Sequence, residues 1–426
     1  MPISGSSVGR LPLSGSDWRS DATLAPEIKP PPIGERTASE LRAVLLTGAT
    51  GFLGAHVLYE LLQRTTAKIY CLVRSNSDTT AAERLGSQLT QLRIPIVPHD
   101  PRVQAIAGDL SKPLLGLSLA SFHDLAASLD AIYHCGGQVH FGQPYQVLHP
   151  TNVMGIHEIL RMAALETAKP VHSVSTLALF FNKSAQDPGC VSEYDSPQLA
   201  LDERSGYLQS KWVAERLLLI ARERGMGTCI YRTGRISAHS QTGAANGRDL
   251  LNNLVKGCLL LGAFPSLDIE LSLAPVDYIS QAIVHLSLQS SCLGKDFHLV
   301  SPHPVPWRAF MQMVGSQGYS LSEMDYEAWL TLLRRTAAMH AERESLIRLW
   351  MVVHASNHLL SRRPRYTLPN SSAGLAGSGI CCPAIDTAYL GRFLSYLQTQ
   401  RSAAQHSMNR PDSTDEPSGK QGNQQQ

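Results

Sequence analysis

From residue 43 onward, short runs of apolar residues alternate with longer stretches in which apolar positions recur at helical spacing. The runs predict strands at residues 43–47, 69–73, 103–107, 131–134, 171–175 and 229–232, and a helix is predicted from about residue 54 to residue 64. Strands that alternate with helices are typical of βαβ units. The pattern therefore predicts an α/β fold with a doubly wound parallel sheet, in which ligands bind at the carboxyl ends of the strands.

Beyond residue 240 the alternation weakens, and helical patterns at residues 249–261 and 276–288 precede a short strand-like run at 297–300. This change predicts a smaller, mainly helical C-terminal substrate domain over residues 241–400, with some chain returning to the core of the sheet domain at 41–240. Residues 1–40 are rich in Pro, Ser and Gly, and residues 401–426 in Ser, Gln and Asn. We expect a flexible lead-in or linker and a disordered tail there.

The composition excludes several classes of partner. Hydrophobic residues make up 43% of the 426 residues and the net charge is only +2, so the chain is globular and no nucleic acid is expected. The N-terminus lacks the pattern of a signal peptide, and no apolar stretch approaches the ~20 residues that cross a bilayer. The eight cysteines form no C-x-x-C pair, which argues against a metal site. We expect a cytoplasmic monomer with no membrane partner.

Three glycines follow the first predicted strand with the spacing G-x-x-G-x-x-G. Such glycines permit a tight strand-to-helix turn and a close approach of the backbone to a pyrophosphate, which the N-terminus of the next helix attracts. A glycine-rich turn without a ligand has the same pattern, so the motif alone is weak. The candidate dinucleotide-binding residues in this segment are Thr47, Gly48, Thr50, Gly51, Phe52, Leu53 and Gly54.

The second predicted strand ends at Arg74, where a site for NAD usually has an acidic residue. A guanidinium can hold the 2′-phosphate of NADP, so Arg74 favours NADPH, although a solvated arginine at a strand end is the alternative. Arg84 is a second candidate for the same phosphate. Asp109 either accepts a hydrogen bond from the adenine amine or forms a turn. Other candidates at the ends of strands three and four are Leu110 and Gly136.

A Tyr-x-x-x-Lys pair, Tyr207 and Lys211, lies in a helical pattern, so both side chains share one helix face. A neighbouring ammonium stabilises phenolate and is expected to lower the pKa of the tyrosine, which then donates a proton, while the lysine also binds the nicotinamide ribose. Thr176, or alternatively Ser175, ends the fifth strand and places a hydroxyl beside the phenol. Side chains alternate along a strand, so only one of the two faces the cleft.

Together these motifs resemble those of the extended short-chain dehydrogenase/reductase superfamily, and within it the thioester reductase (terminal reductase, male-sterility-like) branch. The resemblance covers residues 40–400 and is most specific in Leu46–Ala55, Ile69–Arg74, Gly108–Leu110, Val174–Thr176, Tyr207–Lys211, Tyr231–Ile236 and Ala274–Tyr278. It implies that Thr176, Tyr207 and Lys211 are catalytic. It also implies that NADPH reduces a thioester on the phosphopantetheine arm of an acyl or peptidyl carrier protein to an aldehyde or alcohol in natural-product biosynthesis.

The chain departs from this branch in two segments expected near the nicotinamide. Thr233 stands where relatives have Pro, and His134-Cys135-Gly136-Gly137 stands where they more often show Asn-Gly-Ala. We interpret His134 and His172 as core or cleft-wall residues. No carrier segment is recognised, so the chain is expected to act in trans or to be an excised domain.

Two other functions fit part of the pattern. A nucleotide-sugar epimerase or dehydratase shares the fold and the Tyr/Lys pair, but such enzymes mostly use NAD, which Arg74 disfavours. A non-catalytic NADP-sensing regulator would keep the glycines and need neither Tyr207 nor Lys211.

Overall fold

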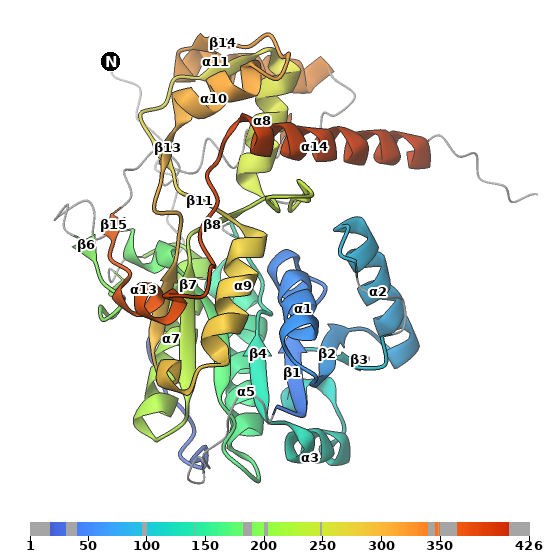
Figure 1. Ribbon diagram of the computed structural model, residues 1–426, viewed down its shortest axis with the longest axis vertical. Coiled ribbons are helices and arrows are strands. Elements are labelled where there is room, and N and C mark those ends of the chain that lie inside the picture. The colour runs from blue at the N-terminus through green and yellow to red at the C-terminus, as the bar shows by residue number, and fades with distance from the viewer. Residues whose placement is uncertain are drawn as a thin grey trace, which may run out of the picture.

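The computed structural model describes residues 18–30, 41–95, 100–140, 142–181, 190–199, 203–247, 249–339, 346–347, 349 and 364–408. A seven-stranded sheet with the order β12-β7-β5-β4-β1-β2-β3 forms its centre (Figure 1). All neighbouring strands in it are parallel. The strands are β1 (Ala43–Thr47), β2 (Lys68–Arg74), β3 (Val103–Gly108), β4 (Ala131–His134), β5 (Val171–Thr176), β7 (Thr228–Thr233) and β12 (Asp296–Leu299). The predicted doubly wound parallel sheet is confirmed.

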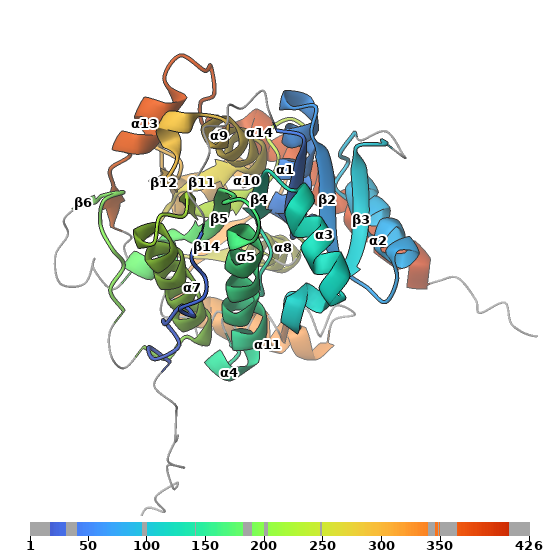
Figure 2. The ribbon, with the colours of Figure 1, turned by 90° about the horizontal axis from the view of Figure 1, so that it is seen from below.

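Helices cover both faces of the sheet (Figure 2). One face packs against α1 (Phe52–Arg64), α2 (Asp78–Gln91) and α9 (Val276–Ser287). The other face packs against α3 (Leu119–Ser128), α5 (Gly155–Ala164) and α7 (Gly206–Glu223), with α4 (Tyr145–His149) and the π-helix η3 (Pro150–Met154) leading into α5. Along β1, Val44 and Leu46 enter the first core while Leu45 enters the second. Because both faces are covered, the central strand β1 is a fully buried apolar run, whereas the edge strand β3 is mostly half-buried.

The helical domain lies above the carboxyl ends of the strands in Figure 1. Its core is built around two buried tryptophans, Trp307 and Trp329. Its helices are α8 (Leu250–Leu261), α10 (Trp307–Gly315), α11 (Tyr326–Met339) and α14 (Thr387–Met408). Short strand pairs join them, namely β9 (Ala263–Pro265) with β14 (Ser322–Met324) and β10 (Glu270–Leu271) with β13 (Val305–Pro306).

Between these helices the chain returns to the sheet domain. Strand β11 (Leu273–Pro275) pairs with β8 (Arg235–Ser237) and leads into α9, which packs on α1. The strand expected at 297–300 is β12, which forms the edge of the central sheet. A second return brings β15 (Arg365–Tyr366) beside β6 (Cys190–Val191) and α13 (Pro369–Leu375) onto β12. The chain therefore passes between the two domains several times, and residue 240 marks only the first passage.

The segment 18–30, which falls in the expected lead-in, packs against the sheet domain. Trp18, Leu24 and Ile28 are buried in the same core as α7. Residues 1–17 and 31–40 lie outside the described residues. At the other end of the chain, α14 continues to Met408, past the expected start of the tail at residue 401, and residues 409–426 lie outside the described part.

Candidate active site

The glycine motif forms the turn between β1 and α1. Gly48 has φ +76°, and a Cβ on it would lie 2.6 Å from the backbone nitrogen of Gly136. A Cβ on Gly54 would lie 2.1 Å from the carbonyl oxygen of Gly48. Both positions thus require glycine. Helix α1 starts after Gly51 with no side-chain cap and no acidic residue in its first turn, so its N-terminus can bind an anion such as a pyrophosphate.

Thr47 and Gly136 join the ends of β1 and β4 beside this turn. The Gly136 N–H donates a hydrogen bond to Thr47 Oγ1 at 3.1 Å, and the same hydroxyl is 2.9 Å from His134 Nδ1. Leu110 packs on Gly136, since a Cβ there would lie 2.6 Å from its Cδ1 atom. Burial lowers the pKa of His134 to about 3. These contacts hold the ends of β1 and β4 together, and the interpretation of His134 as a core or cleft-wall residue agrees with its neutral, buried ring.

The second cluster of cofactor candidates surrounds a pocket of about 360 Å³ at the ends of β2 and β3. Its lining consists of Arg74, Ser75, Asn76, Thr80, Arg84 and Asp109. The Arg84 guanidinium donates a hydrogen bond to the carbonyl oxygen of Arg74. Asp109 Oδ1 accepts hydrogen bonds from the backbone nitrogen of Ser111 at 2.9 Å and from its hydroxyl at 2.8 Å, so Asp109 does form a turn. Two guanidinium groups at one open pocket suit a phosphate.

The candidate proton donor lies where α7 begins. Tyr207 is 7% exposed and is hydrogen bonded to Thr176. Burial raises the pKa of the phenol to about 12, and the hydrogen bond with Thr176 lowers it only in part. The expected lowering by Lys211 is thus not seen in the structure: burial raises the pKa of the phenol, and the group that lowers it is Thr176.

Lys211 follows one helical turn later on the same face of α7. Its Nζ atom donates a hydrogen bond to the carbonyl oxygen of Val174 at 2.8 Å. Burial lowers the pKa of this ammonium to about 8, although Glu215 and Cys135 both raise it. The lysine is therefore mostly charged at neutral pH and close to titration above it.

The structure separates the two candidate hydroxyls at the end of β5. Ser175 is buried, and its Oγ donates a 2.6 Å hydrogen bond to Glu215 Oε2. Thr176 bonds Tyr207, and its Oγ1 also accepts a 3.1 Å hydrogen bond from the backbone nitrogen of Ala178. Thr176 is thus the hydroxyl beside the phenol.

Thr233, at which the chain departs from its relatives, and the candidate His172 both contact neighbouring residues in the structure. Thr233 donates a 3.3 Å hydrogen bond to the carbonyl oxygen of Ser175. His172 stacks on Tyr133 with ring centroids 4.9 Å apart and lies 3.1 Å from the hydroxyl of Tyr231. Burial lowers the pKa of His172 to about 3. It is a core histidine, as interpreted from the sequence.

Two residues that sequence reasoning missed connect the site to its surroundings. Glu215 continues the row of Tyr207 and Lys211 along α7, and this spacing was the available signal. Asn152, in the π-helix η3, donates hydrogen bonds to the Gln138 carbonyl and to the Ser210 hydroxyl, both at 3.0 Å. No local pattern marked Asn152.

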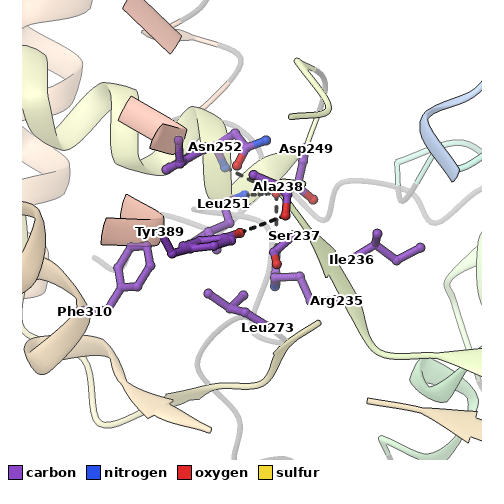
Figure 3. Close-up of a pocket in the computed structure, with 11 residues that line it drawn as sticks. Arg235, Ile236, Ser237, Ala238, Asp249, Leu251, Asn252, Leu273, Phe310 and Tyr389 are labelled. Carbon is purple, nitrogen blue, oxygen red and sulfur yellow. Dashed lines mark hydrogen bonds and ion pairs between the residues drawn. The ribbon is translucent and has the colours of Figure 1, made fainter. Parts of the chain in front are cut away.

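A separate small pocket lies between β8 and the helices of the second domain (Figure 3). Tyr389 points toward β8 there, and its hydroxyl donates a 3.2 Å hydrogen bond to the Ala238 carbonyl. The pocket measures about 10 Å³, which is room for about one water molecule. It is therefore a packing gap at the domain junction and too small for a substrate.

Two absences among the described residues set further limits. No group of three or more His, Cys, Asp and Glu side chains in them is arranged to hold a metal ion. Within the same ranges, no helix combines the length and the apolar character needed to cross a bilayer.

Comparisons with known proteins show which family the chain belongs to. Residues 46–283 match the family model described as "Male sterility protein". A linear gramicidin synthase protein of Brevibacillus parabrevis is 36% identical over 90% of this chain, which spans only 8% of that protein. Isonitrile lipopeptide synthase of Streptomyces coeruleorubidus is 35% identical over 89% of this chain and 26% of its own length.

A solved structure extends the likeness to the whole fold. The terminal R domain of the myxalamid PKS-NRPS pathway is 36% identical, with a TM-score of 0.83, over 90% of this chain and 97% of that one. The chain therefore belongs to the male sterility protein family, in the terminal-reductase branch of the extended short-chain dehydrogenase/reductase superfamily.

Proposed function

We propose that this chain uses NADPH to release an acyl or peptidyl group from a carrier-protein thioester as an aldehyde, with further reduction to the alcohol possible. The observation that carries the proposal is the cluster of Thr176, Tyr207 and Lys211 beside the glycine turn of a terminal-reductase fold. The chain spans a small part of the synthetases that it matches, so their activities and partners enter only as part of this proposal.

NADPH is proposed rather than NADH because of the pocket that Arg74 and Arg84 line. A 2′-phosphate can form charge-assisted hydrogen bonds with both guanidinium groups, whereas a ribose hydroxyl cannot. When bound, NADPH supplies the hydride.

The side chains supply the proton and the charge. Tyr207 keeps its proton at neutral pH because burial raises its pKa, so it can donate to the oxyanion that forms at the thioester carbonyl. Thr176 contributes a second hydroxyl to the same oxygen. Lys211 holds a positive charge nearby and offers hydrogen bonds to the ribose. The resulting thiohemiacetal loses the phosphopantetheine thiol, which takes a proton, and the aldehyde is released.

The substrate class follows from the thioester and from the second domain. Sulfur donates poorly into the carbonyl, so a thioester accepts hydride without prior activation by ATP. The helical domain stands over the strand ends and would form one wall of the channel for the phosphopantetheine arm (Figure 1). All eight cysteines are free thiols, which suits a cytoplasmic protein. We propose a monomer that binds a carrier protein and no nucleic acid.

Mass spectrometry of products tests this proposal. The purified chain is incubated with NADPH and a panel of acyl- and peptidyl-carrier thioesters, with Tyr207→Phe as the matched variant. We expect an aldehyde or alcohol and a carrier that regains its free thiol, both strongly reduced in the variant. Conversion of a nucleotide sugar, with no product from any thioester, would instead identify an epimerase or dehydratase.

A further inference from the structure

The row of catalytic side chains on α7 continues beyond Lys211 to a buried carboxylate. Glu215 is 1% exposed and lies one helical turn after Lys211. Its Oε2 accepts the 2.6 Å hydrogen bond from Ser175, and its Oε1 accepts a 2.9 Å hydrogen bond from Arg232 Nε. One carboxylate thus ties α7 to both β5 and β7.

These contacts form a matched register between β5 and α7. Three consecutive strand residues bond three helix residues that are spaced by one turn. The pairs are Thr176 with Tyr207, Val174 with Lys211, and Ser175 with Glu215. Because Ser175 is held on the buried side, the alternation of the strand directs Thr176 toward the phenol.

Arg232 holds the carboxylate from the far side. It is fully buried, and its Nη2 lies 2.8 Å both from Glu215 Oε1 and from Asp296 Oδ2 on β12. Asp296 is also bound by Arg222 at 2.6 Å. A buried ionic cluster generally stabilises a fold no better than apolar packing does. Its position directly behind the site therefore indicates a role in geometry and charge.

We propose that Glu215, held by Arg232, is a positioning residue for the reduction: it fixes the end of β5 so that Thr176 meets Tyr207, and it keeps Lys211 positively charged. This inference rests on the proposed function for its catalytic part. The part about charge concerns only the protonation of Lys211.

The charged and titratable groups that face Lys211 support the second role. On α7 this group is Glu215, while Tyr207 lies one turn before Lys211 on the same helix, and from the end of β4 the groups are His134 and Cys135. The His134 ring is neutral, and burial raises the pKa of the Cys135 thiol to about 12, so at neutral pH neither is charged. Glu215 is then the negative charge that opposes the burial of the ammonium.

Binding of NADPH as a function of pH tests the charge role without any thioester. Titrations by cofactor fluorescence from pH 6.5 to 9.5 compare the unmutated protein with Glu215→Gln. Without the carboxylate the pKa of Lys211 falls further below its usual range, so NADPH affinity is lost at lower pH. We expect the pH midpoint of this loss to fall by about one unit in the variant. At a pH between the two midpoints, the variant should then bind NADPH up to roughly tenfold more weakly than the unmutated protein.

Glu158→Gln is the matched control, because Glu158 is a buried carboxylate on α5 with an arginine partner, Arg161. Its midpoint should equal that of the unmutated protein. A folded Glu215→Gln protein, verified by thermal unfolding, that keeps the unmutated midpoint would overturn the charge role.

Ser175→Ala tests the geometric role and does not disturb the ion pair. We expect kcat for thioester reduction to fall by roughly tenfold while KM and the midpoint for NADPH binding stay unchanged. An unchanged kcat in Ser175→Ala would overturn the geometric role. This test remains available if Glu215→Gln does not fold. If the unmutated chain reduces no thioester while the midpoint moves in Glu215→Gln, the proposed function fails and the charge role stands.

Discussion

The Nζ atom of Lys211 donates its hydrogen bond to the backbone carbonyl of Val174 at 2.8 Å. The ammonium is thus anchored to the end of strand β5, and the hydroxyl that bonds the phenol of Tyr207 belongs to Thr176. We infer that Tyr207 and Thr176 act on the carbonyl oxygen of the substrate, while Lys211 binds the cofactor and supplies a positive charge.

Removal of the phenol hydroxyl separates these roles. Tyr207→Phe keeps the ring that fills the buried position, so NADPH binding should survive while turnover falls by roughly 10²–10⁴. Lys211→Met should weaken both. Steady-state kinetics and fluorescence titrations measure the two effects, and full turnover in Tyr207→Phe would move the acid role to Thr176 or to water.

A pair of glycines tests the cofactor turn. In Gly54→Ala the new Cβ would lie 2.1 Å from the Gly48 carbonyl oxygen, so the turn must shift and NADPH binding should be lost. Gly86 in helix α2 is the matched control, since a Cβ there meets nothing within 4 Å. Gly86→Ala should bind NADPH normally and gain about 0.5–1 kcal/mol of unfolding free energy. Normal binding by Gly54→Ala would show that the pyrophosphate lies elsewhere.

The pocket at the end of β2 predicts cofactor preference. Arg74→Ala removes one of the two guanidinium groups that line it, so NADPH affinity should fall by about tenfold to a hundredfold. NADH affinity should not change, because NADH has no 2′-phosphate. Isothermal titration with both cofactors measures the ratio. Equal affinities of the unmutated protein for NADPH and NADH would refute the assignment.

The packed N-terminal segment should contribute to stability. The guanidinium of Arg224 donates hydrogen bonds to the carbonyl oxygens of Leu24, Ala25 and Ile28 at 2.7–3.1 Å. Arg224→Met should therefore lower the free energy of unfolding in urea by about 1–3 kcal/mol. Arg335→Ala, at an exposed position on α11, should change it by less than about 0.5 kcal/mol. Equal midpoints for the two variants would mean that the segment adds no stability.

The sheet was predictable because its strands are buried on both faces. Apolar residues dominate strands such as β1 and β2, and the glycines at the end of β1 mark the turn that follows. Strand β12 was harder to place because it comes after the chain has left the sheet and returned, and its partner β7 is distant in sequence. The packing of residues 18–30 was missed for a similar reason. Their composition suggests a linker, whereas Trp18, Leu24 and Ile28 are buried only through distant contacts.

The site, too, could be predicted from the sequence only where residues close together in the chain determine it. Spacing along a helix indicates that Tyr207 and Lys211 are neighbours. The pKa of the phenol, however, depends on its burial, which spacing does not reveal, so its direction was predicted wrongly. The choice between Thr176 and Ser175 likewise required the position of Glu215.

Hydride transfer itself is the most direct test of the central claim. The chain is incubated with NADPH that carries deuterium at the transferred position of nicotinamide C4, together with either an acyl-carrier thioester or the matching free acid. We predict one deuterium on the former thioester carbon of the released aldehyde, and none with the free acid. Deuterium uptake with the acid alone, or no transfer to any thioester while a nucleotide sugar is converted without net NADPH consumption, would contradict it.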